Sequence, residues 1–488
     1  METDFADIRE FRGHSLYLQR LCARWFYWAS YVTRVEGRVL LEEISLLQQI
    51  ISQMSFVDIF NTCVFLVFAC CYLYQLIYVL IVLLNKQPQF PDAEPHKYAV
   101  LITARNESAV IADLINSIRS TDYPQDKIDI FLCADNCTDD TAKIARNAGA
   151  IVYERNNLDA IGKGYALDFL LNHIWEDYPD GDHEAYFVFD ADNVLDKNYF
   201  REMNKVFASG AIASTSYRNS KNYDSNWISA GYAVWFLREA KFLSQARLLC
   251  NTSCAISGTG FFIAASVLKE AGGWKWHLLT EDIQFSASTI ADGGRIAYCP
   301  TAILYDEQPI TFRDAWNQRF RWAKGFYQVF WKYAPKLFCG MFTQKKGYKF
   351  ACYDMLMTVS PAMLLTVITI AFNAIIVILG IAGALTLGTA VVSSLSSIFF
   401  CLFNYMLFMF MFGVLTTFVE WDSIHAPKSK KILYMFTFPC FMITYIPIAL
   451  WALVRPATWK PIKHTISVDA SKFSELAGSE ESSEDKAE

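Results

Sequence analysis

The sequence predicts an α/β domain with a doubly wound sheet, joined to four apolar helices that span a membrane. Between residues 96 and 310, apolar runs of strand length alternate with segments of helical periodicity. Long apolar stretches flank this region, once at residues 57–84 and three times within residues 355–454. Residues 311–350 connect the two parts and carry the pattern of amphipathic, interfacial helices.

The α/β domain is predicted from four runs that are apolar along their whole length. Strands of this kind, separated by helices, form a parallel sheet that is covered on both faces. A ligand of such a sheet binds at the carboxyl ends of the strands. The predicted strands are Tyr98–Ala104, Ile128–Asp135, Ala150–Glu154 and Ala185–Asp192.

The first predicted span, residues 57–84, has one acid at its start and no other charge. As a helix it would be about 42 Å long, which is enough for a tilted span. Three further spans are predicted at Met355–Gly380, Val391–Val419 and Ile432–Val454, the last interrupted by two prolines. The chain is therefore predicted to be an integral, multi-pass protein of the plasma or cell membrane, in contact with membrane lipids.

Basic residues predict the orientation of these spans. The loop Glu420–Lys431 contains three lysines, which places it, and by parity the α/β domain, in the cytoplasm. Parity also puts the C-terminus outside, in conflict with Arg455, Lys460 and Lys463. Either the last segment is re-entrant or the charge rule fails there, and the sequence leaves both open.

The two ends of the chain and its composition restrict the possible partners and structural elements. Residues 1–56 form an N-terminal amphipathic segment, and residues 455–488 a basic and then acidic tail that we expect to be disordered. Residues 469–488 hold seven acids against two lysines, so the rest of the chain is near neutral and nothing suggests a nucleic-acid partner. The thirteen cysteines form no Cys-x-x-Cys pair, which predicts neither disulfides nor a zinc site.

Each predicted strand ends in, or is followed by, polar residues. Asp and Asn at such junctions are often only helix caps, and we favour that interpretation for Asp139, Asp140 and Asn193. However, four successive strand ends meet along one edge of the sheet, where their side chains can converge on a ligand. The four groups are Thr103–Glu107, Asp135–Asp140, Gly162–Gly164 and Asp190–Asn193.

The clearest of these signals is Asp190-x-Asp192, which follows the apolar run Tyr186–Phe189. Two carboxylates at this spacing on a turn can converge on a divalent cation. Mg²⁺ and Mn²⁺ favour one or two carboxylates together with phosphate oxygens and water. Lys163 lies between two glycines, which permits close approach to phosphate, although a solvated lysine is the commoner case.

Thr280-Glu281-Asp282 precedes a helical pattern. One interpretation is an ordinary helix start with acids in its first turn. The other is that Asp282 is a general base, which takes a proton from an acceptor hydroxyl. The glycine-containing segments Gly258–Gly260 and Gly272–Trp274 are expected to line the same cleft, although glycine pairs mark turns more often than sites.

A second amphipathic helix is predicted around Trp316–Trp331. On a helical wheel its apolar stripe lies roughly 150° from Gln318, so Gln318, Arg321 and Trp322 share the opposite, polar face. A surface helix with one stray tryptophan would show the same pattern.

These motifs, taken in order, resemble the membrane-integrated glycosyltransferases of family 2, which include cellulose, chitin, hyaluronan and poly-N-acetylglucosamine synthases. The series is Asp135, Asp190-x-Asp192, Thr280-Glu281-Asp282 and Gln318-x-x-Arg321-Trp322. The resemblance covers about residues 96–335. The arrangement of the predicted spans, with one before the domain and three after it, is most similar to that of the chito-oligosaccharide synthases. The resemblance implies a GT-A-like fold.

The resemblance also implies roles for the site residues. Asn106, Glu107 and Asp135 would hold the nucleoside, Lys163 the diphosphate, and Asp190 and Asp192 the donor through Mg²⁺ or Mn²⁺. Asp282 would be the catalytic base, and Gln318 and Arg321 would bind the donor diphosphate from the interfacial helix. Trp322 and Glu281 would contact the acceptor.

The resulting hypothesis is an inverting, metal-dependent enzyme that moves a sugar from a nucleotide sugar, such as a UDP-sugar, to a growing β-linked glycan, in a processive manner. One alternative is transfer of a single sugar to a lipid-linked or other membrane acceptor. Another is a non-catalytic protein that binds or exports polysaccharide. A dehydrogenase is disfavoured because no Gly-x-Gly-x-x-Gly follows the first strand. The sequence does not reveal the sugar, the linkage, the acceptor or the oligomeric state.

Overall fold

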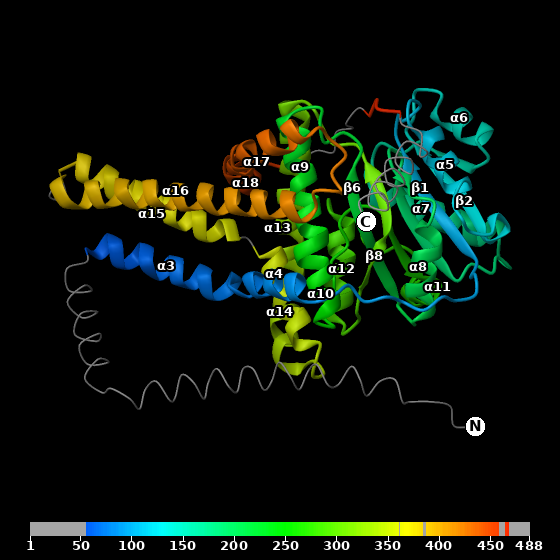
Figure 1. Cartoon of the computed structure of the whole chain (residues 1–488), viewed down its shortest axis with the longest axis horizontal. Coiled ribbons are helices and arrows are strands. Elements are labelled where there is room, and N and C mark those ends of the chain that lie inside the picture. Colours follow the sequence, from blue (N-terminus) through cyan, green and yellow to red (C-terminus); the bar gives the residue numbers. More distant parts are fainter. Residues whose placement is uncertain (1–54, 361, 384–386, 458–463, 468–488) are drawn as a thin grey trace, which may run out of the picture. The chain divides into compact units, whose positions relative to one another are not determined.

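The computed structural model describes residues 55–360, 362–383, 387–457 and 464–467. The predicted N-terminal amphipathic segment and acidic tail lie almost entirely outside these residues. The described chain divides into two units, one made of residues up to 65 with residues 371–398, and one made of residues 66–370 with residues from 399 onwards. The second unit contains the α/β domain (Figure 1).

Within the described residues the α/β domain holds one eight-stranded sheet, in the order β3-β2-β1-β4-β7-β6-β8-β5. The first, second and fourth strands have the predicted starting points, and all four lie where the apolar runs predicted them. The strands are β1 Tyr98–Ala104, β2 Ile128–Asp135, β3 Ile151–Arg155, β4 Ala185–Asp190, β5 Val194–Leu195, β6 Ala213–Ser220, β7 Phe261–Ala264 and β8 Ala297–Asp306.

The sheet is mixed, whereas the sequence predicted a parallel one. Strands β1 to β4 are parallel to one another, as expected. Strand β7 runs antiparallel to both of its neighbours, β4 and β6. Its four apolar residues are too few to show a periodicity, so the sequence does not predict this strand or its direction.

Helices cover both faces of this sheet, as expected for strands that are apolar throughout. Alternate residues of β1, such as Leu101 and Ile102, enter two separate cores. One core is closed by α7 (Lys163–Asp177) and α9 (Trp227–Arg238), the other by α5 (Ile111–Arg119) and α8 (Tyr199–Ala208). The remaining helices of the domain are α6 (Thr141–Asn147), α10 (Gln245–Leu249), α11 (Ala265–Ala271) and α12 (Glu281–Ala291), with the short elements η1 (Gln125–Lys127) and η2 (Glu239–Ser244).

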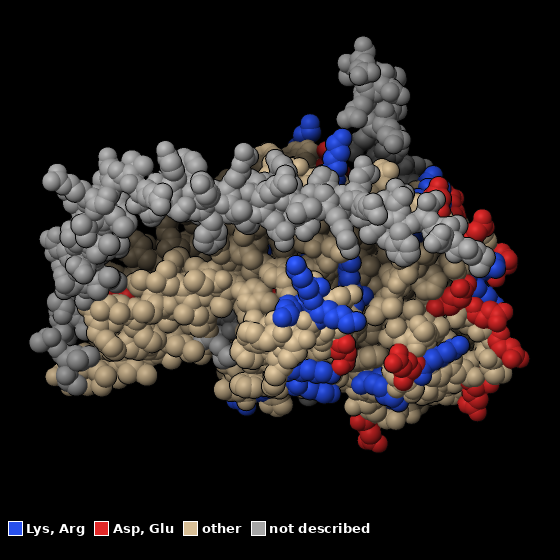
Figure 2. Space-filling model, turned by 90° about the horizontal axis from the view of Figure 1, so that it is seen from below, with Lys and Arg blue, Asp and Glu red and all other residues tan. Residues whose placement is uncertain are grey.

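Three stretches of helix are long and apolar enough to cross a membrane: residues 56–84, 391–419 and 428–454 among those described. A shorter apolar helix covers residues 367–381. In Figure 2 the acidic side chains gather at the α/β end of the view and basic side chains extend to its middle, whereas the visible face of the long helices carries almost no charged side chain. The helices are α3 (Phe56–Tyr72), α4 (Tyr74–Leu84), α14 (Lys349–Val359), α15 (Ala362–Ile381), α16 (Leu387–Val419), α17 (Lys428–Ile443) and α18 (Tyr445–Val454).

Two of the predicted spans differ from the helices in the structure. The second was expected to begin at Met355, but α14 ends at Val359 and α15 begins at Ala362. Ser360 takes an extended ψ of 130°, which is typical of a residue before proline. The last span is divided between α17 and α18 at Thr444 rather than at either proline.

The predicted amphipathic helix is α13 (Phe312–Thr343). Its apolar stripe does not face open solvent, because Phe320, Ala323 and Tyr327 pack against Ala452 of α18. The apolar face thus lies on the end of the last membrane-associated helix, which keeps the opposite face of α13 turned towards the α/β domain.

The loop after α16 is bound to the α/β domain. The Tyr217 hydroxyl of β6 donates a hydrogen bond to Glu420, and the Asn219 side chain donates to the Ser423 carbonyl oxygen at 2.7 Å. Lys430, at the start of α17, donates to the Asp224 carbonyl oxygen at 2.7 Å. This loop and the sheet therefore lie on the same side of the adjoining apolar helices.

A buried ion pair joins α4, α10 and α14. Arg247 Nε and Nη2 each donate a hydrogen bond of 2.8 Å to one carboxylate oxygen of Asp354. The Tyr74 and Tyr78 hydroxyls of α4 donate to the same carboxylate. Asp354 and Arg247 are 1% and 3% exposed, so neither charge has water as an alternative partner.

Replacing Asp354 by Asn should therefore destabilise the fold, because Arg247 keeps a buried charge without its counter-ion. We expect a loss of about 3 kcal/mol or more in the free energy of unfolding, measured as a lower unfolding midpoint of the detergent-solubilised protein. Asp422→Asn, at an exposed position, is the matched control; equal midpoints for the two variants would contradict the prediction.

Candidate active site

The outer end of the site is formed by the ends of β2 and β3. Asp135, the last residue of β2, is buried and accepts a hydrogen bond from Arg155 Nη1 at 2.5 Å. Burial raises the pKa of Asp135, against the opposing effect of Arg155. Asn106 lies beside it in the left-handed conformation, with φ of 60°, and its side-chain oxygen accepts from the Thr138 amide at 2.7 Å.

Glu107 is bound by a residue that the sequence did not assign to the site. His464 Nδ1 lies 3.0 Å from both carboxylate oxygens of Glu107. The next two amides, of Thr465 and Ile466, donate to the Glu307 carboxylate. Burial raises the pKa of Glu107 to about 7, and although burial opposes a charge on His464, Asp192 and Glu107 raise its pKa to about 10.

Asp190 lies at the end of β4, where Lys163 binds it. The Lys163 ammonium donates to Asp190 Oδ1 at 2.5 Å and to the Gly258 carbonyl oxygen at 2.7 Å. Burial acts to lower the pKa of Lys163, but Asp190 and Glu281 outweigh it and raise that pKa. Asn193 accepts from the Asp190 amide at 3.2 Å and from the Thr259 hydroxyl, so it holds this turn rather than capping a helix.

Asp192 is 5% exposed and accepts a hydrogen bond from the Glu307 amide at 2.9 Å. Burial acts to raise its pKa, yet the positive charges of His464 and Lys221 outweigh this and hold the pKa below its usual value. The Lys221 ammonium is buried and has no hydrogen-bond partner among the described residues. It is therefore a cation next to Asp192 that is available to an anionic ligand.

Asp190 and Asp192 fit a hard divalent cation by their chemistry. Both are carboxylates on one turn, and Asp190 Oδ2 accepts no hydrogen bond within the described residues. No group of three or more His, Cys, Asp or Glu side chains arranged for a metal occurs in the described ranges. A site of two carboxylates that is completed by phosphate oxygens and water is the kind that Mg²⁺ and Mn²⁺ use.

The Thr280-Glu281-Asp282 motif lies at the start of α12, directly beside this turn. The Gly258 amide donates to Asp282 Oδ2 at 2.6 Å, while the carbonyl oxygen of the same residue accepts from Lys163. Gly258 has φ of +80°, a conformation that residues with side chains rarely adopt. One peptide segment thus connects the predicted base to the predicted donor-binding lysine.

Both acids of the motif are buried, at 6% and 8% exposure. Burial, followed by the negative charge of Asp282, raises the pKa of Glu281 to about 7. Burial also raises the pKa of Asp282, against the opposing effects of the Ile283 amide and Lys163. A carboxylate with a raised pKa accepts a proton more readily, which is what a general base requires.

Helix α13 brings its polar face to this motif. Arg321 Nη1 donates to the Leu279 carbonyl oxygen at 3.1 Å, and its charge acts on Glu281 and Asp282. Gln318 Oε1 is buried and has no hydrogen-bond partner among the described residues. Trp322 lies edge-on to Tyr232 and Phe236, with ring centroids 5.8 and 6.1 Å apart.

The approach of α13 to the motif depends on a glycine. A Cβ atom added at Gly325 would lie 2.5 Å from Thr280 Cγ2 and 2.6 Å from Thr280 Oγ1. No larger residue fits there without moving the helix, so Gly325 sets how close Arg321 and Trp322 lie to Asp282.

The structure thus brings together Lys163, Asp190 and Asp282 through Gly258, with Asp192 and Glu107 connected to them electrostatically. Of the two glycine segments expected in the cleft, Gly258–Gly260 lies in the site. Trp274 is instead fully buried in the core of the α/β domain.

Sequence reasoning missed five residues around the site: Arg218, Lys221, Asp306, Glu307 and His464. A signal existed for two of them, because Asp306 and Glu307 follow the apolar end of β8 as Asp190 and Asp192 follow β4. Arg218, Lys221 and His464 lie at positions that no spacing connects to the other motifs.

The fold and the site together define a class. A mixed sheet whose central strand ends in Asp-x-Asp, with a buried acid at a helix start facing that turn, is a GT-A-like glycosyltransferase fold. Accordingly, the structure of the mannosyltransferase PcManGT from Pyrobaculum calidifontis, determined with GDP-Man and Mn²⁺, has the same fold. It superposes with a TM-score of 0.51 at 16% identity, over 80% of this chain and 99% of that one.

Sequence comparison shows which family part of the chain is similar to. Residues 95–325, just under half of the chain, match the family described as "Glycosyltransferase like family 2". A β-monoglucosyldiacylglycerol synthase from Synechocystis is 27% identical over 256 residues, 51% of each chain. A poly-β-1,6-N-acetyl-D-glucosamine synthase from Staphylococcus aureus (strain COL) is 26% identical over 254 residues, 50% of this chain and 58% of that protein. The match spans just over half the length of these relatives.

The raised pKa values of Glu281 and Asp282 predict the pH range in which activity is lost on acidification. As the pH falls below about 7, a proton binds the Glu281–Asp282 pair and removes the charge that a base needs. We expect the acid limb of kcat/KM to lie well above the range of an ordinary aspartate. Glu281→Gln removes the neighbouring negative charge and should move that limb to lower pH; an unmoved limb would contradict the assignment.

Gly325→Ala should lower kcat/KM without unfolding the protein, because it displaces α13 from Thr280. A displacement of about 1 Å costs on the order of 100-fold in rate. The control is a double-mutant cycle: in a Thr280→Ala background both clashing atoms are absent, so Gly325→Ala should cost much less. An equal cost in both backgrounds would rule out the steric explanation.

Proposed function

We propose that the chain is a membrane-bound inverting glycosyltransferase that moves a sugar from a UDP-sugar to a hydroxyl of a growing β-linked glycan. One observation carries the proposal: Gly258 binds the Asp282 carboxylate through its amide and the Lys163 ammonium through its carbonyl oxygen. One residue therefore holds both Asp282, which is suited to proton transfer, and Lys163, which is suited to binding a diphosphate.

In this mechanism the donor lies along the carboxyl ends of β1, β2 and β4. Asn106, Glu107 and Asp135 contact the nucleoside, and Lys163 the diphosphate. Asp190 and Asp192 would hold a Mg²⁺ or Mn²⁺ ion, which when bound supplies charge that stabilises the leaving diphosphate.

Asp282 acts as the base on the acceptor side. It takes the proton of the attacking hydroxyl while that oxygen displaces the diphosphate in line, so the anomeric configuration inverts. Arg321 and Gln318 face the leaving group from α13, and Glu281 and Trp322 the acceptor. Burial of the site strengthens each of these charge interactions, because water does not screen them.

Two features bear on the acceptor. The relatives include synthases named for a polymer and synthases named for a glycolipid, so transfer of a single sugar to a lipid acceptor is the second candidate. The described residues contain three helices that are long and apolar enough to span a membrane and one shorter apolar helix, which are few to line a channel for a long product and favour this second candidate. The length of the product separates the two.

The catalytic domain is proposed to lie in the cytoplasm. The loop after α16 binds β6 and leads into the first turn of α17, which carries the lysines that predict a cytoplasmic position. A cysteine introduced at exposed Asp422 should therefore react with an impermeant maleimide only in inverted vesicles. Labelling in sealed, right-side-out cells would reverse this orientation.

Asp282→Asn should reduce turnover by about 10²- to 10⁴-fold, the range of general base catalysis, with little change in donor KM. Asp192→Ala should reduce turnover and weaken donor binding as well. The measurement is release of UDP from a panel of UDP-sugars with Mg²⁺ or Mn²⁺, followed by sizing of the product. Asp180→Asn, at an exposed position, is the control; parental activity in both site variants would refute the proposal, and additions of one sugar only would refute chain extension.

A further inference from the structure

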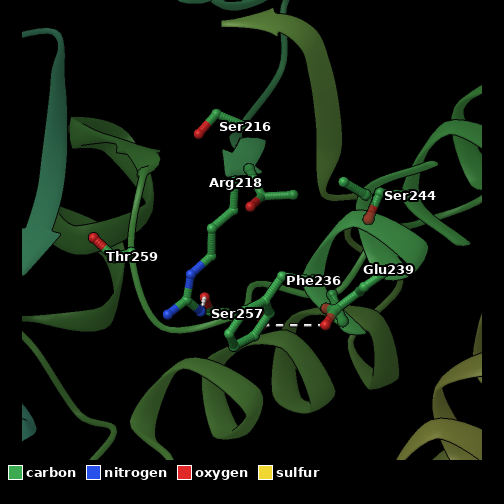
Figure 3. A pocket seen from close by; sticks show the side chains of 10 residues that line it. Ser216, Arg218, Phe236, Glu239, Ser244, Ser257 and Thr259 are labelled. Atoms are coloured by element: carbon green, nitrogen blue, oxygen red, sulfur yellow. Dashed lines mark hydrogen bonds between the residues drawn. The ribbon is translucent and has the colours of Figure 1, made fainter. Parts of the chain in front are cut away.

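A small polar cavity lies behind the Gly258 turn (Figure 3). It encloses about 310 Å³ of empty space, counting its opening to solvent. Ser257 and Thr259 line it from the two sides of Gly258. Its interior accommodates roughly one water-sized group, so it suits a hydroxyl or hydroxymethyl rather than a whole sugar ring.

Glu239 is the carboxylate of this cavity. Its one hydrogen bond within the described part of the chain is a long one, 3.4 Å, from the Ser257 hydroxyl. No lysine or arginine nitrogen lies within ion-pair distance of it in the described residues, and its pKa is raised by burial against the effects of Arg218 and Arg247. Glu239 is partly buried and its carboxylate has free acceptor capacity, so it can accept a hydrogen bond from a ligand group that enters the cavity.

The backbone around Glu239 is unusual. Residues 239–244 form a π-helical turn, η2, between α9 and α10. Such turns contain one extra residue within an α-helix and are frequently found at functional sites. Here the turn ends the helix that carries Phe236, so Glu239 and Phe236 face the same cavity (Figure 3).

The opposite wall carries Arg218, whose charge is paired with Asp306, since Arg218 Nε donates to the Asp306 carboxylate at 2.6 Å. Arg218 lies over the Phe236 ring, 3.7 Å from its centroid, and Arg218 Nη1 donates to the Ser257 carbonyl oxygen at 3.1 Å. The Glu239 carboxylate disfavours an anion, and the paired guanidinium leaves no net charge on its wall to attract one. A neutral group that donates a hydrogen bond to Glu239, namely a hydroxyl, suits this cavity.

The cavity lies on the acceptor side of the site. Phe236 lines it and also contacts Trp322, whereas the proposed nucleoside-binding residues lie at β1 and β2. Gly258, which binds the proposed base, separates Ser257 from Thr259 in the cavity wall. An acceptor that offers one hydroxyl to Asp282 can thus offer a second to Glu239.

We propose that this cavity is a specificity subsite in which Glu239 binds a second hydroxyl of the acceptor, so that the acceptor is a sugar with free hydroxyls. The inference rests on the function proposed above and deepens it. Diacylglycerol has a single free hydroxyl and cannot occupy both positions. The sugar belongs either to a free glycan or to the head of a glycolipid, because the two present the same chemistry.

The test measures acceptor-stimulated UDP release by the full chain. The probes are octyl β-glucoside, octyl β-N-acetylglucosaminide, cellobiose, chitobiose and 1,2-dioleoylglycerol. We expect sugars to stimulate release, and Glu239→Ala to raise the acceptor KM about tenfold or more, with donor KM within about twofold of the parent. Glu239→Gln keeps the shape of the side chain, so its acceptor KM should lie between those of the parent and Glu239→Ala. Glu270→Gln, at an exposed position, should behave as the parent.

Several outcomes would overturn the subsite: stimulation by dioleoylglycerol alone, a change in donor KM instead of acceptor KM, or parental acceptor KM in both Glu239 variants. If the alanine variant fails to fold, the isosteric glutamine variant decides. Stimulation by cellobiose or chitobiose identifies a glycan acceptor, and stimulation by the octyl glycosides alone a glycolipid; either result supports the subsite. Failure of the proposed function looks different, because the parent would then release no UDP from any donor, with or without acceptor.

Discussion

The site depends on one peptide segment, at Gly258. Its amide hydrogen-bonds Asp282 and its carbonyl oxygen hydrogen-bonds Lys163, which in turn binds Asp190. Opposite charges that would otherwise attract each other directly are thus held apart by a neutral group that satisfies both. Because the φ of Gly258 is +80°, this arrangement is specific to a residue without a side chain.

A second constraint is electrostatic. Six charged groups lie in one region, those of Glu107, Asp190, Asp192, Lys221, Glu307 and His464. Neighbouring acids raise the pKa of His464 although burial opposes this, whereas burial lowers the pKa of Lys221, whose ammonium has no hydrogen-bond partner in the described chain. The four carboxylates outnumber the two cations, so a divalent cation would offset the excess negative charge of this region.

Much of this could be predicted from local sequence. Strands β1, β2 and β4 are largely apolar, and together with β3 their position and parallel direction could be predicted from the alternation of apolar runs with helical patterns. Strand β7 could not be predicted, because four apolar residues carry no direction. His464 is 357 positions from Glu107, and only tertiary structure brings the two together. Arg218 and Glu239 lie in a strand and a helix end with no periodic signal, so the cavity that they line is visible only in three dimensions.

The loop that follows α16 accepts hydrogen bonds from Tyr217 and Asn219, the two neighbours of Arg218 in β6. Side chains alternate along a strand, so these two point to one face while Arg218 points to the other. A displacement of this loop would therefore displace the strand that carries Arg218, and with it the guanidinium that lies over Phe236.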